Sequence, residues 1–138
     1  MEHQTEFTKL YSEKWNMRFS FFTQNGAPCT KNNRRALKEL PLFGRMKISM
    51  NWWAFFFGFI YFLILGLWRQ ALSLLGITIL VSVIVEFVAP AMGLYITPSI
   101  ATGINLGMMG MWAMTANYAY YLKEVRGIRG WNPFKGIF

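Results

Sequence analysis

The stretch Met50–Trp68, MNWWAFFFGFIYFLILGLW, decides the fold because none of its nineteen residues is charged. A helix that crosses a bilayer needs about 20 predominantly apolar residues. Two more apolar runs follow, ALSLLGITILVSVIVEFV at Ala71–Val88 and SIATGINLGMMGMWAMTANYAYYL at Ser99–Leu122. Together the three runs predict an all-α membrane protein.

These runs divide the chain into three parts. The parts are a basic cytoplasmic helical region at 1–48, a membrane domain at 49–122 with segments 50–68, 71–88 and 99–122, and a short basic aromatic juxtamembrane tail at 123–138. Between Lys47 and Lys123 the only charged residues are Arg69 and Glu86. Lysine and arginine beside membrane segments tend to stay in the cytoplasm, so the charges predict the topology.

Two topologies are compatible with this pattern. If all three segments cross, the positive tail lies outside. If segment 50–68 enters and leaves by the cytoplasmic face and the other two segments form a hairpin, every Lys and Arg stays inside and only the uncharged loop Ala89–Pro98 is external. Gly58 lies near the middle of the first segment, where a break leaves two halves that each fit one leaflet. The sequence favours this re-entrant topology, with both termini cytoplasmic, and leaves three crossings open.

The N-terminal region carries a helical pattern. Aromatic residues recur there at helical spacing, at Tyr11, Trp15, Phe19 and Phe22. Thr30 is a candidate N-cap for a second helix at Lys31–Leu40, and we expect Pro41 and Gly44 to break the chain before the membrane. Helices this short bury little surface alone, so we expect them to pack on another part of the protein or on a partner.

Composition limits the possible chemistry. The 138 residues include fourteen Lys and Arg against six Glu, which gives a net charge of +8. One cysteine, Cys29, cannot form an intrachain disulfide, and one histidine, His3, cannot build a His/Cys metal site or serve a Ser/His/Asp arrangement without its partners. We therefore expect neither an enzyme nor a bound metal or cofactor.

Glu86 is the acidic residue of the membrane domain, and intramembrane carboxylates often mark ion or proton pathways. Helix rise places Glu86 about 8 Å and Asn105 about 9 Å below the outer face of the hydrocarbon core. The sequence therefore predicts that the two side chains meet across a hairpin of the second and third segments. The alternative is a proton or cation path through Glu86.

Small residues recur every four positions along the third segment, at Ser99, Gly103 and Gly107. This pattern lets helix backbones approach closely in lipid. The predicted contact is either with the second segment of the same chain or between copies in a homo-oligomer.

The tail predicts contact with the membrane surface. It carries four cations and an interfacial aromatic residue, Lys123, Arg126, Arg129, Lys135 and Trp131. Basic residues beside a span gain about 1 kcal/mol each from anionic headgroups, and tryptophan prefers the interface. Anionic phospholipid is therefore the expected partner, in preference to nucleic acid.

Several motifs resemble those of a known family. They are the run Asn51–Gly58 (NWWAFFFG), Tyr61-Phe62, Gly66-Leu67-Trp68, Tyr11–Trp15 (YSEKW), Arg35–Lys38 (RALK) and Gly130–Phe134 (GWNPF). This combination is similar to the YigF/YigG-like domain-of-unknown-function family of small bacterial inner-membrane proteins. The resemblance covers most of the chain and implies a multi-pass protein of the inner membrane, without an activity or catalytic residue to transfer.

Function is the least determined property. We expect a scaffold or accessory protein that acts through protein or lipid contacts. Two other classes remain open, namely a small oligomeric transporter or channel that uses Glu86, and an immunity or accessory protein for a membrane-active partner.

Overall fold

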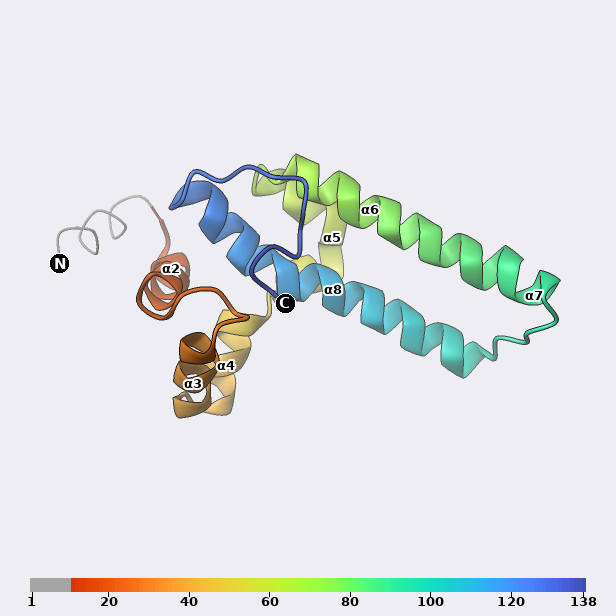
Figure 1. The fold of residues 1–138 in the computed structure, drawn as a ribbon, viewed down its shortest axis with the longest axis horizontal. Helices are drawn as coiled ribbons and strands as arrows, with labels where there is room; N and C mark the ends of the chain where they lie inside the picture. Colours follow the sequence, from red (N-terminus) through yellow and green to blue (C-terminus); the bar gives the residue numbers. More distant parts are fainter. Residues whose placement is uncertain (1–10) are drawn as a thin grey trace.

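The computed structural model describes residues 11–138, which are helical and contain no strand (Figure 1). In chain order the elements are α2 (Glu13–Asn25), α3 (Lys31–Glu39), α4 (Leu42–Ser49), α5 (Trp52–Ile64), α6 (Trp68–Val83), the π-helical turn η1 (Ile84–Val88), α7 (Ala89–Ala91) and α8 (Pro98–Glu124). The prediction of an all-helical chain is confirmed, and each predicted segment corresponds to helix.

The N-terminal helices begin and end close to where the sequence places them. Thr30 is the N-cap of α3, and its hydroxyl accepts a hydrogen bond from the amide of Asn33 at 3.3 Å. Pro41 separates α3 from α4, as expected, because proline cannot donate the next helical hydrogen bond. The expectation that Gly44 breaks the chain is wrong, since Gly44 lies inside α4, where a glycine costs only about 1 kcal/mol.

One cation of α2 is buried. Arg18 is 1% exposed, and its Nε donates to the carbonyl of Lys47 at 2.7 Å while its guanidinium lies 4.7 Å from the ring centre of Trp15. Burial lowers the pKa of Arg18 to about 10, so the side chain remains charged at neutral pH. This contact fastens the end of α4 to α2.

Helix α5 is sharply broken at Gly58, whose φ of 38° and ψ of −106° are not helical. The amide of Asn51 donates to the Tyr61 hydroxyl at 3.1 Å, so the second half of α5 returns toward its beginning. Asn51 also binds the carbonyl of Ala113, and the carbonyl of Leu65 binds Lys123. Both ends of α5 are therefore anchored on the C-terminal half of α8.

The long helices form an antiparallel hairpin that projects away from the rest of the molecule (Figure 1). Continuous helix runs over the 24 residues Trp68–Ala91, about 36 Å, and over the 27 residues of α8, about 40 Å. The first arm extends past the predicted end at Val88 and includes Pro90. Pro90 has no N–H, and η1 directly before it absorbs the changed hydrogen bonding.

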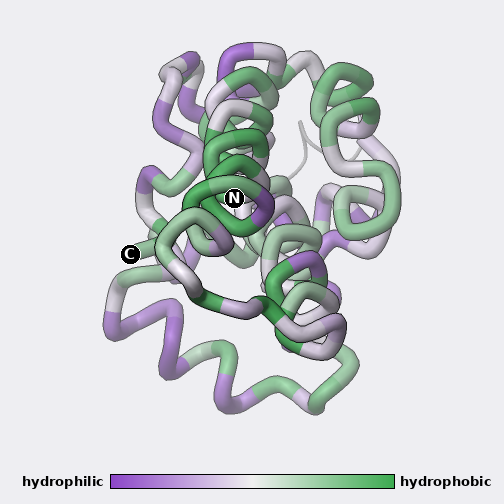
Figure 2. The backbone as a smooth tube through the Cα atoms, turned by 90° about the vertical axis from the view of Figure 1, so that its right-hand side faces the viewer, coloured by the Kyte–Doolittle hydropathy of each residue, from purple (hydrophilic) through white to green (hydrophobic). Residues whose placement is uncertain are grey.

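The buried residues gather at one end of this hairpin, which we call the base. One cluster joins α5, the start of α6 and α8 around Phe62 and Trp112, and a second joins α2 and α4 to α8 around Phe19 and Tyr121. In the range 76–110, which contains the outer half of the hairpin, Ala89 is the only buried residue. Figure 2 looks along the hairpin and shows hydrophobic coils in the centre and at the upper right, with the longest hydrophilic stretches at the left and lower left.

By length and composition, two helical stretches of the described chain could cross a membrane, Leu42–Ile64 and Trp68–Ala91. The first is interrupted at Asn51 and broken at Gly58, so it does not form one straight span. The second is continuous. Helix α8 is long enough but less apolar, because polar residues and glycines occur along both of its halves. Thr115 and Asn117, in its C-terminal half, are buried within the protein.

Candidate functional site at the base of the hairpin

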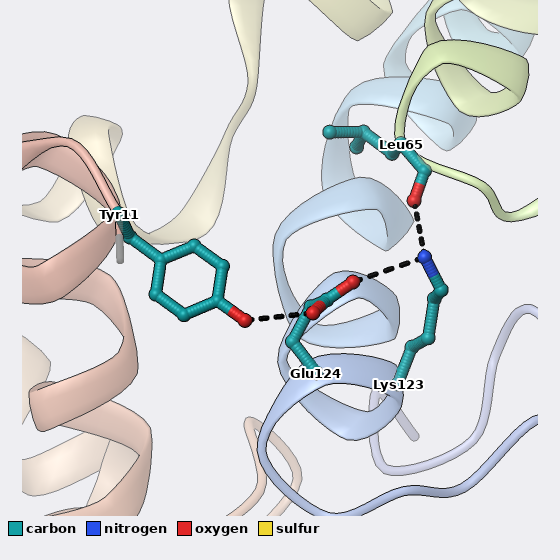
Figure 3. A network of polar contacts seen from close by, with 4 residues as sticks. All are labelled: Tyr11, Leu65, Lys123 and Glu124. Carbon is teal, nitrogen blue, oxygen red and sulfur yellow. Dashed lines mark hydrogen bonds and ion pairs between the residues drawn. The ribbon is translucent and has the colours of Figure 1, made fainter. Parts of the chain in front are cut away.

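A polar network joins three parts of the chain at the base (Figure 3). Lys123, near the end of α8, donates to the carbonyl of Leu65 at 2.9 Å and forms an ion pair with Glu124 at 3.0 Å. The hydroxyl of Tyr11 donates to the other carboxylate oxygen of Glu124 at 2.7 Å. The network therefore ties the end of α5 and the segment before α2 to the end of α8.

The charges of this network are fixed at neutral pH. Burial and the hydrogen bond to Glu124 raise the pKa of Tyr11 to about 12. Burial acts to raise the pKa of Glu124, but the hydrogen bonds from Tyr11 and Lys123 outweigh it and the pKa is lowered. A neutral phenol and a carboxylate thus remain paired across the physiological range, which suits a structural clamp.

A second polar node lies deeper in the base. The Asn51 amide donates to Asn117 Oδ1 at 3.1 Å, and Asn117 Nδ2 donates to the carbonyl of Ile48 at 2.9 Å. The carboxamide oxygen of Asn51 accepts from the first amides of α5, at Trp53 and Ala54. Both asparagines are at most 1% exposed. They fix the point at which α5 starts and crosses α8.

The C-terminal segment is docked on the start of α6. Arg69 donates to the carbonyl of Arg129 at 2.9 Å, and its guanidinium lies 5.3 Å and 5.9 Å from the rings of Trp68 and Trp131. The two tryptophans make an edge contact at 5.4 Å, and Ser73 donates to the carbonyl of Trp131 at 2.7 Å. The tail therefore presents its cations from a folded surface.

The five residues predicted to touch the membrane surface have different surroundings. Arg126, Arg129, Lys135 and Trp131 are exposed. Lys123 has a side chain only 16% exposed, and it holds Leu65 and Glu124. Lys123 therefore links α5 to α8 within the protein, whereas the other four residues are available at the surface.

Sequence reasoning missed Asn51, Asn117 and Arg69 as organisers of the base. The available signal was their position, because an uncompensated polar side chain inside or beside an apolar run is expensive and must find a partner. The predictions that rested on His3 fall outside the described residues. Among residues 11–138, no three His, Cys, Asp or Glu side chains lie together as a metal site.

Glu86 and Asn105 line the same groove between the two arms of the hairpin. The groove has a volume of about 150 Å³ and also includes Thr78 and Ser82. The two residues therefore lie at the same level along the hairpin. The described chain nevertheless contains no hydrogen bond between them, and Glu86 is exposed at the π-helical turn.

The small residues of α8 are not packed within the chain. A Cβ added at Gly103 or Gly107 would find no atom within 4 Å apart from its chain neighbours and the nearby backbone of α8, and Ser99 is exposed near the start of α8. The sequence left open a contact with segment 71–88 of the same chain or a contact between copies. The first of these does not form at Gly103 or Gly107.

Comparison with known proteins gives a family and relatives. Residues 4–126 match the family described as "Protein of unknown function (DUF2628)". Over 125 residues the chain is 34% identical to "Uncharacterized protein YigF" of Salmonella typhimurium and to the protein of that name from Escherichia coli, covering 88% of this chain and 90% of each relative. No solved structure matches the chain. The chain therefore belongs to the DUF2628 family of proteins of unknown function.

Proposed function

We propose that the chain is a bacterial inner-membrane scaffold or accessory protein. In this proposal the arm Trp68–Ala91 and α8 cross the bilayer as a hairpin, and α5 enters and leaves from the cytoplasmic side. The helices α2 to α4 and the tail then lie at the cytoplasmic face, where they contact protein partners and anionic lipid.

The distribution of exposed apolar side chains carries this proposal. Soluble monomers rarely expose an apolar patch above about 300–600 Å². Here large apolar residues are exposed on α5, along α6 and η1, and on α8, including Trp53, Phe56, Phe57, Ile60, Ile64, Leu72, Ile79, Leu80, Ile84, Phe87, Ile100 and Leu106. Lipid accepts such a surface without cost, whereas water does not.

The re-entrant arrangement is supported by the path of α5. Non-helical backbone at membrane depth is tolerated where protein shields it. The break at Gly58 lies against the ring of Trp112, near the middle of α8, at 3.5 Å from the position of a Gly58 Cβ. Both ends of α5 return to the base, and the base carries the basic tail.

A scaffold is preferred to a catalyst because the polar groups of the base are occupied with one another. Lys123, Glu124 and Tyr11 satisfy each other and the end of α5, and the asparagine pair satisfies the start of α5. What remains available is a basic surface on α3, where Arg34, Arg35 and Lys38 are exposed. This surface is suited to an acidic protein partner.

Cysteine labelling in living cells tests the proposal. In a Cys29→Ser background, single cysteines replace Ser49, Trp68 or Tyr95, and a membrane-impermeant maleimide is added outside. Tyr95→Cys, at the hairpin tip, should react in intact cells, while Ser49→Cys and Trp68→Cys should react only after lysis. External labelling of Trp68→Cys with Ser49→Cys protected would mean that α5 crosses. Protection of all three would contradict the hairpin.

The groove at Glu86 favours a second candidate, a small transporter. A carboxylate, an amide and two hydroxyl-bearing residues facing one groove can bind a proton or cation. Loss of proton-coupled flux in Glu86→Gln at equal expression would favour this candidate, and unchanged cellular behaviour of that variant would favour the scaffold.

A further inference from the structure

A cavity at the base is large enough for a small ligand. It lies between the start of α6, the end of α8 and the C-terminal segment, and its volume of about 390 Å³ falls within the range of ligand sites. Its walls combine apolar and polar groups, supplied by Gln70, Ala119, Leu122, Ile128, Gly130, Trp131, Asn132, Pro133 and Lys135. None of the four residues labelled in Figure 3 lines this cavity.

Gln70 is the distinctive residue of this cavity. It is only 6% exposed and lines two cavities, and its amide atoms reach this open space rather than being sealed inside the protein. A carboxamide offers two donors and an acceptor, and leaving such groups unpaired in a buried position costs about 1–3 kcal/mol. Because the amide of Gln70 faces the cavity, water or a ligand there can supply its hydrogen bonds.

The charges around Gln70 are positive. Lys135 lines the same cavity, and Gln70 also lines a neighbouring cavity of about 70 Å³ together with Arg69, Lys123 and Arg129. Glu124, the acidic residue of the polar network at the base, is already paired with Lys123. Arg69 is held in place by the carbonyl of Arg129 and by two tryptophan rings, so its charge is preorganised.

The rest of the cavity wall is apolar and ends at an exposed aromatic ring, which suits the part of a lipid where the headgroup joins the acyl chains. Ala119, Leu122 and Ile128 provide apolar surface, while Trp131 is an exposed indole of the kind that prefers a membrane interface. The ligand chemistry that matches all these features is a phosphate group with hydroxyl or ester oxygens and an adjoining apolar part. Lys135, which lines this cavity, binds the phosphate, and the amide of Gln70 pairs with the oxygens.

We propose that this cavity is a specific site for the headgroup of an anionic phospholipid such as phosphatidylglycerol, with Gln70 as its selectivity residue. This inference rests on the proposed membrane location, which would place the cavity at the cytoplasmic headgroup layer. A soluble glycerol phosphate shares the headgroup chemistry but lacks the acyl chains.

The test uses the full-length protein purified in a neutral detergent. Its thermal unfolding is followed while phosphatidylglycerol, phosphatidylcholine or free glycerol 3-phosphate is added. Phosphatidylglycerol should raise the unfolding temperature saturably, and the other two should not. Gln70→Leu should weaken the apparent affinity about three- to tenfold, the loss expected for one or two hydrogen bonds, without lowering the stability of the lipid-free protein. Gln24→Leu, an exposed change in α2, is the matched control.

Each other outcome overturns a defined part of the proposal. Equal stabilisation by both lipids, or an unchanged affinity in Gln70→Leu, would mean that lipid binds without a specific site, and the membrane function would stand. Binding of free glycerol phosphate as strong as that of the lipid would identify a soluble phosphate ligand instead. If Gln70→Leu destabilises the lipid-free protein, Gln70→Glu provides the deciding measurement. Its affinity for phosphatidylglycerol must be lower than that of Gln70→Leu, because a carboxylate repels the phosphate.

Discussion

Asn51 and Asn117 are 66 positions apart, yet their buried side chains share a hydrogen bond that sets where α5 begins. The sequence identifies each as a polar residue beside or within an apolar run. It does not reveal their pairing, because pairing depends on which turn of α8 faces the start of α5. Single residues of this kind convert a set of apolar helices into one defined arrangement.

Replacing Asn117 by alanine should therefore be costly. The change removes two donors and an acceptor, and it leaves the carbonyl of Ile48 and one donor of Asn51 with fewer partners. We expect a loss of about 2 kcal/mol or more in the free energy of unfolding. Denaturation in detergent measures it, with Asn105→Ala as the exposed control. Equal stability of the two variants would contradict a stabilising role for the node.

The network of Tyr11, Lys123 and Glu124 predicts a dependence of stability on pH. The pKa of Glu124 is lowered from 4.5 in the folded protein, so its contribution is present above pH 4.5 and is lost as pH falls through the folded pKa. The unfolding temperature should therefore fall as the pH drops below 4.5, and less steeply in Glu124→Gln. The pKa of Tyr11 is raised to about 12, so a second loss should occur as pH rises above 10. Tyr11→Phe should reduce this loss without abolishing it, because burial also raises the pKa values of Tyr118 and Tyr120.

At the scale of elements, the sequence predicts the helices and the position of a break in α5, but it does not predict whether that break forms. Apolar runs and caps place each helix within a few residues, because helix formation responds to local pattern. Gly58 marks a possible break, but glycine alone is a weak breaker and occurs inside α4 as well, at Gly44. What makes the break real is the tertiary contact with Trp112 and the return of Tyr61 to Asn51.

Gly58→Ala tests the break directly. The φ of 38° is one that L side chains rarely adopt, and strain of this kind costs about 1–3 kcal/mol. The added Cβ would meet Trp112 at an ordinary 3.5 Å, so the loss of stability should come from the backbone. Gly107→Ala is the matched control, since it lies in regular helix with open space around it and should be neutral or stabilising by up to about 1 kcal/mol. Unfolding in detergent compares the two, and an equally harmless Gly58→Ala would show that α5 does not need its break.

At the scale of the whole molecule, charge and apolar surface are separated along the hairpin. The buried clusters and the basic tail lie at the base, while the tip at Ala89–Pro98 has no charge. The sequence already suggests this asymmetry, since charge patterns are local. It could not reveal that the tail folds back on α6 through Arg69 and Trp131, because cation and ring contacts depend on the packed structure.

The proposed topology predicts that the hairpin tip will not tolerate positive charge. In the triple variant Ala91→Arg, Met92→Arg and Leu94→Arg, three cations must cross the bilayer with the tip, against the tendency of short loops with Lys and Arg to remain inside. We expect several-fold less membrane-inserted protein at equal synthesis, measured by carbonate-resistant membrane content and by Tyr95→Cys labelling from outside.

The control adds the same number of arginines at exposed positions of the base, with Gln24→Arg, Asn32→Arg and Glu39→Arg. These residues stay in the cytoplasm under the proposed topology, so insertion should remain at the wild-type level. A C-terminal fluorescent protein, which matures only in the cytoplasm, should be bright in the wild type and in this control. If the base variant loses insertion and the tip variant keeps it, the hairpin is oriented the opposite way, with both termini outside, because the rule that retains positive loops in the cytoplasm would then act on the tip.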